Sequence, residues 1–321
     1  MAERSTVPNI LVLVHADDAV RERLRAFGGC NIIFADKCGV TEEVVRVADA
    51  MIGEPTPEQL RSAESLRWLQ LTWAGADRYT AMPELAESVT LTNASGAFGE
   101  IISEYVIGTA ISHFRRFAKY GKLQRLHRWQ KLCGSSLSGK CALILGTGDI
   151  GACVARRMRM FGVHTVGVNR SGSASGDFHE LHSIRALDSL IGTADIIVGC
   201  LPGTPETAGL ITPARLALMK KDSLFINVGR GSLVSCDDLA AALTAGRPGG
   251  AVIDVADTEP IPDDSPIWDM ENVMITPHIA GPSFSGDAST TEKIWDICEE
   301  NIRRFLDGRE LLHKVDRALG Y

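Results

Sequence analysis

The chain has 321 residues, of which 45% are hydrophobic, and this length predicts about two globular domains with substantial cores. The net charge is −7 and no dense run of Lys or Arg is present, which argues against nucleic acid or an anionic membrane as the main partner. No signal-peptide pattern precedes the first apolar run, and no segment has the length of a membrane span, so we expect a cytoplasmic protein. The eight cysteines include no C-x-x-C pair, which favours reduced thiols over a disulfide framework or a metal site.

Residues 9–98 alternate short apolar runs with polar, helix-like segments, and this rhythm predicts a first α/β unit. We expect strands at residues 10–14, 32–34, 69–72 and 89–91, and helices at residues 17–27, 41–48 and 57–65. The unit has no phosphate-binding loop. Trp73, Ala74 and Gly75 follow one of its strands, where backbone N–H groups can hold a carboxylate, although an ordinary turn explains the spacing by itself.

Residues 99–120 predict a helix that is apolar on most of its surface and therefore buried between domains or subunits. Glu104 lies within it and needs a partner. The mixed, basic segment 122–139 is expected to run along the outside of the fold.

A glycine-rich turn at residues 146–151 is the strongest motif in the chain. It follows the apolar run 141–145 and opens a segment with apolar residues at helical spacing, so it predicts strand, tight turn and helix. Gly146 would allow the turn, Gly148 would let the backbone approach a pyrophosphate, and Gly151 would let helix and strand pack closely. With the N–H groups of Asp149 and Ile150 at the helix start, the motif predicts nucleotide binding; a ligand-free βα turn is the alternative.

The next strand, residues 164–168, ends at Asn169, Arg170 and Ser171. An acid near this strand end would bind the ribose 2′-hydroxyl of NAD, whereas an Arg accommodates the 2′-phosphate of NADP. No acid precedes Asp177, so we expect NADP(H) to be preferred over NAD(H). A solvated Arg at a strand end is the simpler alternative.

Further strands are expected at residues 196–200, 224–228, 251–255 and 273–276. Ligands in doubly wound sheets bind beyond the carboxyl ends of the strands, so Arg230, Glu259 and His278 should converge there. Arg230 can bind a carboxylate or polarise a carbonyl, His278 can transfer a proton near neutral pH, and Glu259 can orient the His278 ring. Taken singly, each has an ordinary structural explanation. Cys200 also ends a strand, where a small buried hydrophobe is favoured over a reactive thiol.

Three motifs together resemble the D-isomer-specific 2-hydroxyacid dehydrogenase family: residues 223–233, residues 254–260, and residues 275–281. The likeness extends over nearly the whole chain. It implies that Arg230 holds the substrate carboxylate and carbonyl, that His278 is the acid/base and that Glu259 pairs with it. It also implies substrate contacts from the backbone of Ala74 and Gly75, a nicotinamide contact from Asp254, and a homodimer formed through the glycine-loop domain. The remaining cofactor positions in family order are Cys200, Leu201, Pro202, Thr207, Val228, Gly229 and Gly281.

Trp73 departs from the family, which usually has Gly there, and it would reshape the substrate pocket. The sequence Asn169-Arg170-Ser171 resembles the NADP-using glyoxylate/hydroxypyruvate reductase branch. Glu259 argues against the formate dehydrogenase branch, where Gln is usual, and the chain end soon after residue 306 argues against a regulated phosphoglycerate dehydrogenase.

We therefore expect two doubly wound α/β domains with parallel sheets, of Rossmann and flavodoxin-like type, around an interdomain cleft. Residues 103–284 would bind the cofactor, and residues 1–102 with 285–321 would bind the substrate. The expected activity is reversible NADPH-dependent reduction of a small 2-keto acid to the D-2-hydroxy acid, without a metal. The alternative is a dinucleotide-sensing protein of the corepressor type with little turnover.

Overall fold

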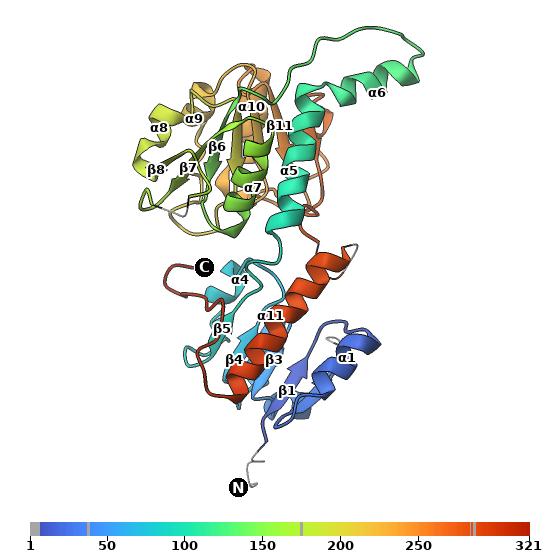
Figure 1. Ribbon diagram of the computed structural model, residues 1–321, viewed down its shortest axis with the longest axis vertical. Coiled ribbons are helices and arrows are strands. Elements are labelled where there is room, and N and C mark those ends of the chain that lie inside the picture. The colour runs from blue at the N-terminus through green and yellow to red at the C-terminus, as the bar shows by residue number, and fades with distance from the viewer. Residues whose placement is uncertain (1–6, 37–38, 174–175, 283, 285–286) are drawn as a thin grey trace. The chain divides into compact units, whose positions relative to one another are not determined.

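A computed structural model describes residues 7–36, 39–173, 176–282, 284 and 287–321 (Figure 1). The chain divides into two compact units, which we call unit 1 (Met1–Ala97 and Pro282–Tyr321) and unit 2 (Phe98–Gly281). Each unit is built on a parallel sheet with helices, which confirms the predicted α/β class.

Within the described residues, unit 1 holds a five-stranded sheet of order β2-β1-β3-β4-β5 in which every neighbouring pair is parallel. This is the flavodoxin-like order. The strands are β1 (Asn9–Val12), β2 (Asn31–Phe34), β3 (Ala50–Ile52), β4 (Trp68–Gln70) and β5 (Thr90–Thr92). The helices are α1 (Asp18–Arg25), α2 (Glu42–Arg46), α3 (Pro57–Ser62), α4 (Asp77–Thr80) and α11 (Ala288–Leu306).

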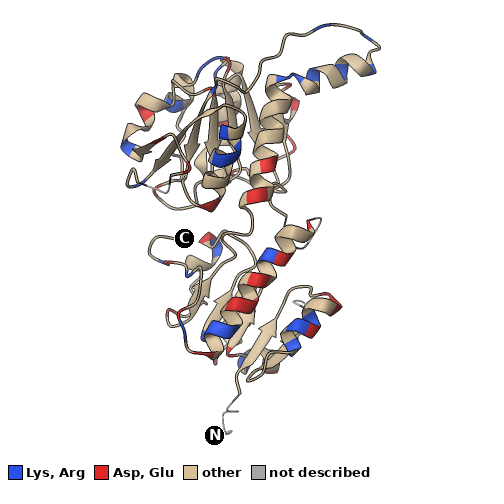
Figure 2. Ribbon diagram, viewed as in Figure 1, with Lys and Arg blue, Asp and Glu red and all other residues tan. Residues whose placement is uncertain are grey.

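Helix α11 shows why the last helix belongs to unit 1. Its buried side includes Ile294, Trp295 and Ile302, which are at most 1% exposed. Figure 2 shows several charged residues along this helix. Outside the apolar stripe, Arg304 Nε lies 2.7 Å from Glu300 Oε1. An apolar stripe opposite a charged face is the pattern of a helix packed on a sheet.

Unit 2 holds a seven-stranded parallel sheet of order β12-β11-β10-β9-β6-β7-β8 across its described residues. Its first six strands in chain order have the Rossmann arrangement, with the order reversing between β6 and β9. The strands are β6 (Cys141–Leu145), β7 (His164–Asn169), β8 (Glu180–Ser183), β9 (Ile196–Gly199), β10 (Leu224–Asn227), β11 (Gly250–Ile253) and β12 (Val273–Ile275). The helices are α5 (Gly99–Phe114), α6 (Phe117–Arg125), α7 (Asp149–Met160), α8 (Leu187–Leu190), α9 (Pro213–Leu218) and α10 (Cys236–Thr244), with short 3₁₀ turns at Ile184–Ala186, Gly231–Leu233 and Pro266–Asp269.

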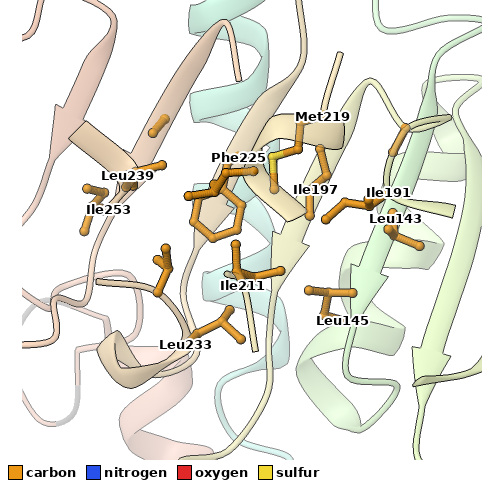
Figure 3. Packing of buried hydrophobic residues seen from close by; sticks show 14 of the residues in the cluster. Leu143, Leu145, Ile191, Ile197, Ile211, Met219, Phe225, Leu233, Leu239 and Ile253 are labelled. Carbon is orange, nitrogen blue, oxygen red and sulfur yellow. The ribbon is translucent and has the colours of Figure 1, made fainter. Parts of the chain in front are cut away.

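The core of unit 2 lies between the sheet and the helices on one of its faces (Figure 3). Phe225, Ile197 and Leu143 come from the neighbouring strands β10, β9 and β6, and they are at most 1% exposed. Met219 and Leu239 cover them from the segment after α9 and from α10. Parallel strands covered on both faces need continuous apolar runs, and this is why the sequence signals them strongly.

The long helix expected at residues 99–120 is two helices. Arg116 takes a left-handed conformation with φ of 60° between α5 and α6, and this ends the first helix. Helix α5 is also less buried than predicted, because Glu104 and Gly108 face solvent. Glu104 has a partner, Arg157 of α7, at 3.5 Å.

Candidate active site

The glycine turn joins β6 to α7 at the point where the strand order reverses. Gly146 has φ of +102°, and a Cβ there would lie 2.6 Å from the Cys200 carbonyl oxygen. A Cβ on Gly151 would collide with the Gly146 carbonyl oxygen. A Cβ on Gly148 would meet no atom within 4 Å, so open space lies in front of the helix start.

Gly148 is the N-cap of α7 and provides no side-chain hydrogen bond. The first-turn N–H groups of a helix, here including those of Asp149 and Ile150, have no intrahelical acceptor, and they attract anions. The geometry therefore fits the pyrophosphate of a dinucleotide.

Asn169 organises the turn that follows β7. Its Nδ2 donates to Thr147 Oγ1 at 2.7 Å, and its Oδ1 accepts from the Gly172 amide at 2.6 Å and from Ser171 Oγ at 3.3 Å. Arg170 and Ser171 are exposed. The nearest following acid, Asp177, lies 3.3 Å from Arg156 of α7.

Arg230, Glu259 and His278 follow β10, β11 and β12, which are neighbours in the sheet. Arg230 is half-buried, and its Nη1 donates to the Gly229 carbonyl at 2.9 Å. The Arg230 carbonyl accepts from Asn227 Nδ2 at 2.9 Å, which fixes the start of the loop.

His278 and Glu259 form a direct pair. His278 Nδ1 lies 3.0 Å from Glu259 Oε2, and Glu259 Oε1 accepts from the Ala256 amide at 3.0 Å. Both side chains are about half exposed, at 55% and 42%. Because Nδ1 faces the carboxylate, Nε2 is the ring nitrogen left for a ligand.

Asp254 is buried at 3% exposure and holds the loop that carries His278. Its Oδ1 accepts from Thr276 Oγ1 at 2.6 Å and from the Ile279 amide at 2.8 Å, while Oδ2 accepts from the Ala280 amide at 2.9 Å. The structure thus gives this residue a role in shaping the loop that the sequence pattern did not reveal.

The remaining candidate cofactor positions are small or backbone-facing. Thr207 Oγ1 donates to the Pro202 carbonyl at 2.6 Å, which closes the turn that begins at Leu201. Val228 and Gly229 are buried, and a Cβ on Gly229 would lie 2.7 Å from the Leu201 carbonyl oxygen. Burial raises the pKa of the Cys200 thiol to about 12, so this residue is a poor nucleophile. A Cβ on Gly281 would lie 2.9 Å from Ile102 of α5.

In unit 1, the loop after β4 has its carbonyl groups occupied. The Ala74 carbonyl accepts from Asn93 Nδ2 at 2.7 Å, and the Trp73 carbonyl accepts from the Ala94 amide at 2.9 Å. The amides of Ala74 and Gly75 have no acceptor in the described part of the chain. The Trp73 side chain is 41% exposed.

Glu54 anchors this loop and was missed by the sequence reasoning. It is 6% exposed, and its Oε1 accepts from both the amide and the hydroxyl of Thr72 at 2.8 Å. A lone acid after a three-residue strand carries no sequence pattern that would have identified it.

A cavity of about 530 Å³ lies at the amino ends of β10–β12, and none of the candidate site residues lines it. Its walls include His113, Lys119, Lys140 and Lys221. In the part of the chain that the structure describes, no group of three His, Cys, Asp or Glu side chains is arranged to hold a metal ion. No helix among the same residues is long and apolar enough to cross a membrane.

Comparisons with known proteins identify the family. Residues 107–280 match the D-isomer specific 2-hydroxyacid dehydrogenase, NAD binding domain. A D-isomer specific 2-hydroxyacid dehydrogenase family protein from Aeromonas salmonicida is 34% identical, with a TM-score of 0.87 over 98% of this chain and 100% of that one. An NADPH-dependent glyoxylate/hydroxypyruvate reductase from Sinorhizobium meliloti, in complex with NADP and sulfate, is 28% identical, with a TM-score of 0.85 and coverages of 98% and 100%.

Among curated relatives, a glyoxylate/hydroxypyruvate reductase of Arabidopsis thaliana is 31% identical over 265 residues, which are 81% of this chain and 79% of the relative. The sequence resemblance is thereby confirmed: the chain belongs to the D-isomer-specific 2-hydroxyacid dehydrogenase family, and with it to the oxidoreductases that use a nicotinamide dinucleotide.

Proposed function

We propose that this protein reduces a small 2-keto acid of the glyoxylate or hydroxypyruvate type to the D-2-hydroxy acid, reversibly and with NADPH preferred. The single observation that carries the proposal is the 3.0 Å contact between His278 Nδ1 and Glu259 Oε2, one strand away from Arg230. An acid/base pair beside a guanidinium is the equipment needed to bind a keto acid and protonate its carbonyl.

The reaction divides among these three side chains. NADPH, when bound at the glycine turn, would supply the hydride that the carbonyl carbon accepts. Arg230 binds the keto acid through its carboxylate and carbonyl oxygen and stabilises the negative charge that develops on that oxygen. His278 gives the proton on Nε2 to the carbonyl oxygen as the carbon–oxygen double bond becomes single. Glu259 keeps the ring oriented through its contact with Nδ1. In the reverse direction His278 accepts the proton from the hydroxyl group.

Substrate contacts from unit 1 complete the proposal. The N–H groups of Ala74 and Gly75 would bind the substrate carboxylate, and Trp73 would border the pocket. The support is that these two amides have no acceptor in the described chain while the neighbouring carbonyls are occupied.

The cofactor would lie along the carboxyl ends of the strands of unit 2, with its pyrophosphate at Gly148 and its nicotinamide carboxamide at Asp254. The second contact would use Asp254 Oδ2, which accepts a single hydrogen bond among the described residues. The residues Cys200, Leu201, Pro202, Thr207, Val228, Gly229 and Gly281 would line the dinucleotide.

The preference for NADPH rests on the turn after β7. It presents Arg170 and Ser171 to solvent, and Asp177 is engaged by Arg156. A guanidinium there can bind the 2′-phosphate with charge-assisted hydrogen bonds. Arg170→Ala should lower kcat/KM for NADPH by about tenfold, the scale of one such bond at an exposed position, and leave NADH unchanged. Lys221→Ala, an exposed cation at the opposite, amino-end edge of the same sheet, is the control. An unaltered ratio of kcat/KM for NADPH to kcat/KM for NADH would contradict the role of Arg170.

We also propose that the protein is a cytoplasmic homodimer formed through unit 2. Three large apolar side chains in and after α6 support this proposal. Phe117, in the helix, is 52% exposed, Leu126, just after it, is 61% exposed, and Trp129 is fully exposed. Figure 1 shows this segment extending away from the sheet of unit 2. Analytical ultracentrifugation should give the dimer mass for the native chain and the monomer mass for a Leu126→Asp, Trp129→Asp variant.

The decisive experiment is oxidation of NADPH and NADH by the purified protein with glyoxylate, hydroxypyruvate, pyruvate, phenylpyruvate, ketoisocaproate and ketopantoate. Rapid NADPH-dependent turnover with one acid would establish the substrate class and the cofactor together. If both cofactors bind and neither is consumed, the reductase proposal fails and a dinucleotide-sensing role takes its place.

A further inference from the structure

Three hydrogen-bonding side chains lie in series behind the loop that carries His278. Tyr105 Oη of α5 lies 2.6 Å from Thr276 Oγ1, and Thr276 Oγ1 lies 2.6 Å from Asp254 Oδ1. Asp254 then accepts from the amides of Ile279 and Ala280. The series connects a helix near the start of unit 2 with the last loop of the same unit.

The chemistry of the groups sets the direction of every bond. Thr276 donates its single hydroxyl proton to Asp254 Oδ1. Thr276 then has only lone pairs left for Tyr105, which must be the donor. Burial raises the pKa of Tyr105 and outweighs the opposite effect of its hydrogen bond with Thr276, so the phenol keeps its proton.

The loop that this series holds has an unusual backbone. His278 has φ of +56°, in the left-handed region that most residues avoid. The His278 amide donates to the Asp254 carbonyl at 2.8 Å, so Asp254 binds three consecutive amides, at positions 278, 279 and 280. A strained conformation of this kind persists only where its surroundings hold it in place.

We propose that Tyr105 is a positioning residue for His278, acting through Thr276 and Asp254 to keep the proton donor in its productive orientation. The inference rests on the proposed acid/base role of His278. Tyr105 touches neither His278 nor Glu259 in any hydrogen bond of the described residues, so its influence passes through the loop backbone.

Tyr105→Phe removes one hydroxyl and keeps the ring. We expect kcat to fall by about three- to tenfold, which corresponds to the loss of one buried hydrogen bond, while the dissociation constant of NADPH and the KM of the keto acid stay within twofold. The solvent deuterium isotope effect on kcat should rise, because proton transfer from a misplaced His278 becomes more limiting.

Variants of Thr276 test whether Tyr105 acts on the loop through the Thr276 hydroxyl. Thr276→Ser keeps the hydroxyl and should retain activity, whereas Thr276→Val breaks both bonds and should cost more than Tyr105→Phe. The double variant with Tyr105→Phe and Thr276→Val should be no worse than Thr276→Val alone, because both changes act through the same hydroxyl. If the losses of kcat in the two single variants add up in the double variant, Tyr105 does not act through Thr276 and the proposal is wrong.

Thr109→Val is the matched control. Thr109 is buried on the same helix one turn later, and its hydroxyl donates to the Tyr105 carbonyl at 2.9 Å, away from Thr276. It should leave kcat and the isotope effect unchanged. An equal loss in Thr109→Val and Tyr105→Phe would assign Tyr105 to the stability of α5 and overturn the proposal.

A measurement without turnover separates this inference from the proposed function. In hydrogen–deuterium exchange, the peptide containing Ile279 and Ala280 should exchange faster in Tyr105→Phe than in the native protein, with no change in Thr109→Val. Faster exchange in a protein that reduces no keto acid would uphold the positioning of the loop and contradict only the reaction. Unchanged exchange together with unchanged kcat would contradict the role of Tyr105.

Discussion

Each unit begins its sheet with a strand followed directly by a helix, and the two helices differ at their N-termini. In unit 1, Asp17 precedes α1 and its Oδ1 accepts from the Val20 amide at 2.8 Å. In unit 2, Gly148 precedes α7, has no side chain and faces open space. The first helix therefore carries its own anion, and the second leaves its N–H groups for a ligand. The residue at the cap is thus the difference between the helix that satisfies its own N–H groups and the helix that we propose for phosphate binding.

The units are alike in a second respect. In each, a buried carboxylate holds a loop that follows a strand: Glu54 binds Thr72 in unit 1, and Asp254 binds Thr276 and two amides in unit 2. Buried charges are stable when several donors satisfy them, and donors from the loop backbone fix the loop at the same time. In both units, an acid that need not touch the substrate thus makes several hydrogen bonds to a loop for which we propose a substrate contact.

The largest effect should come from His278. His278→Ala should lower turnover by about 10² to 10⁴, the usual loss for a general acid, with NADPH binding retained. His278→Asn is a second variant, because Asn tolerates the left-handed backbone at this position better than Ala does. The control is His313→Ala in unit 1, since His313 has a similar φ of 54°. Unchanged steady-state turnover in both His278 variants would contradict the role of His278 as the proton donor.

A substitution at Gly148 tests the difference between the N-termini of α1 and α7. Gly148→Ala should fold normally, because its Cβ meets no atom within 4 Å, yet it should weaken NADPH binding by about tenfold by intruding where the pyrophosphate approaches. Gly151→Ala should instead lower the melting temperature, because its Cβ collides with the Gly146 carbonyl. Fluorescence titration and thermal denaturation separate the two effects. Normal NADPH affinity in Gly148→Ala would contradict the phosphate site.

The sequence predicted what depends on local pattern. Apolar runs identified most strands, and the glycine spacing identified the turn into α7. It missed β3, because only Asp49 separates Ala50–Ile52 from the predicted helix 41–48, and it missed β8, because Glu180–Ser183 is polar. The end of α5 before Arg116 depends on the positive φ of Arg116, which its residue type does not predict.

The candidate site was predictable to the same extent. Arg230, Glu259 and His278 were selected because strand ends mark ligand sites and because the three residues have distinct chemistry. Tyr105 and Thr276 are 171 positions apart, and neither stands in a recognisable motif, so only the structure joins them. The structure also gives Asp254 three donors from its own chain.

A smaller effect should follow from the capped helix. Asp17→Ala removes the side-chain acceptor of α1 and should lower the free energy of unfolding by about 1 kcal/mol, without changing NADPH affinity. Asp18→Ala, at the next position and without the capping bond, is the control and should cost less. Urea denaturation measures the first quantity and fluorescence titration the second. A change in NADPH affinity would mean that α1 is coupled to the dinucleotide site, against the division of roles between the two helices.

The smallest effect is expected at Cys200, which follows β9 beside the glycine turn. A thiol forms the reactive thiolate only as the pH approaches its pKa, and for Cys200 that value is about 12. Iodoacetamide at pH 8 should therefore modify the exposed Cys133 and leave Cys200 and the activity intact. Cys200→Ser should keep kcat within about twofold, since a conservative change away from a reacting group costs little. Mass spectrometry and turnover are measured together. If iodoacetamide inactivates the native protein and Cys200→Ser prevents this, the reacting group lies at the end of β9 and not at the ends of β11 and β12.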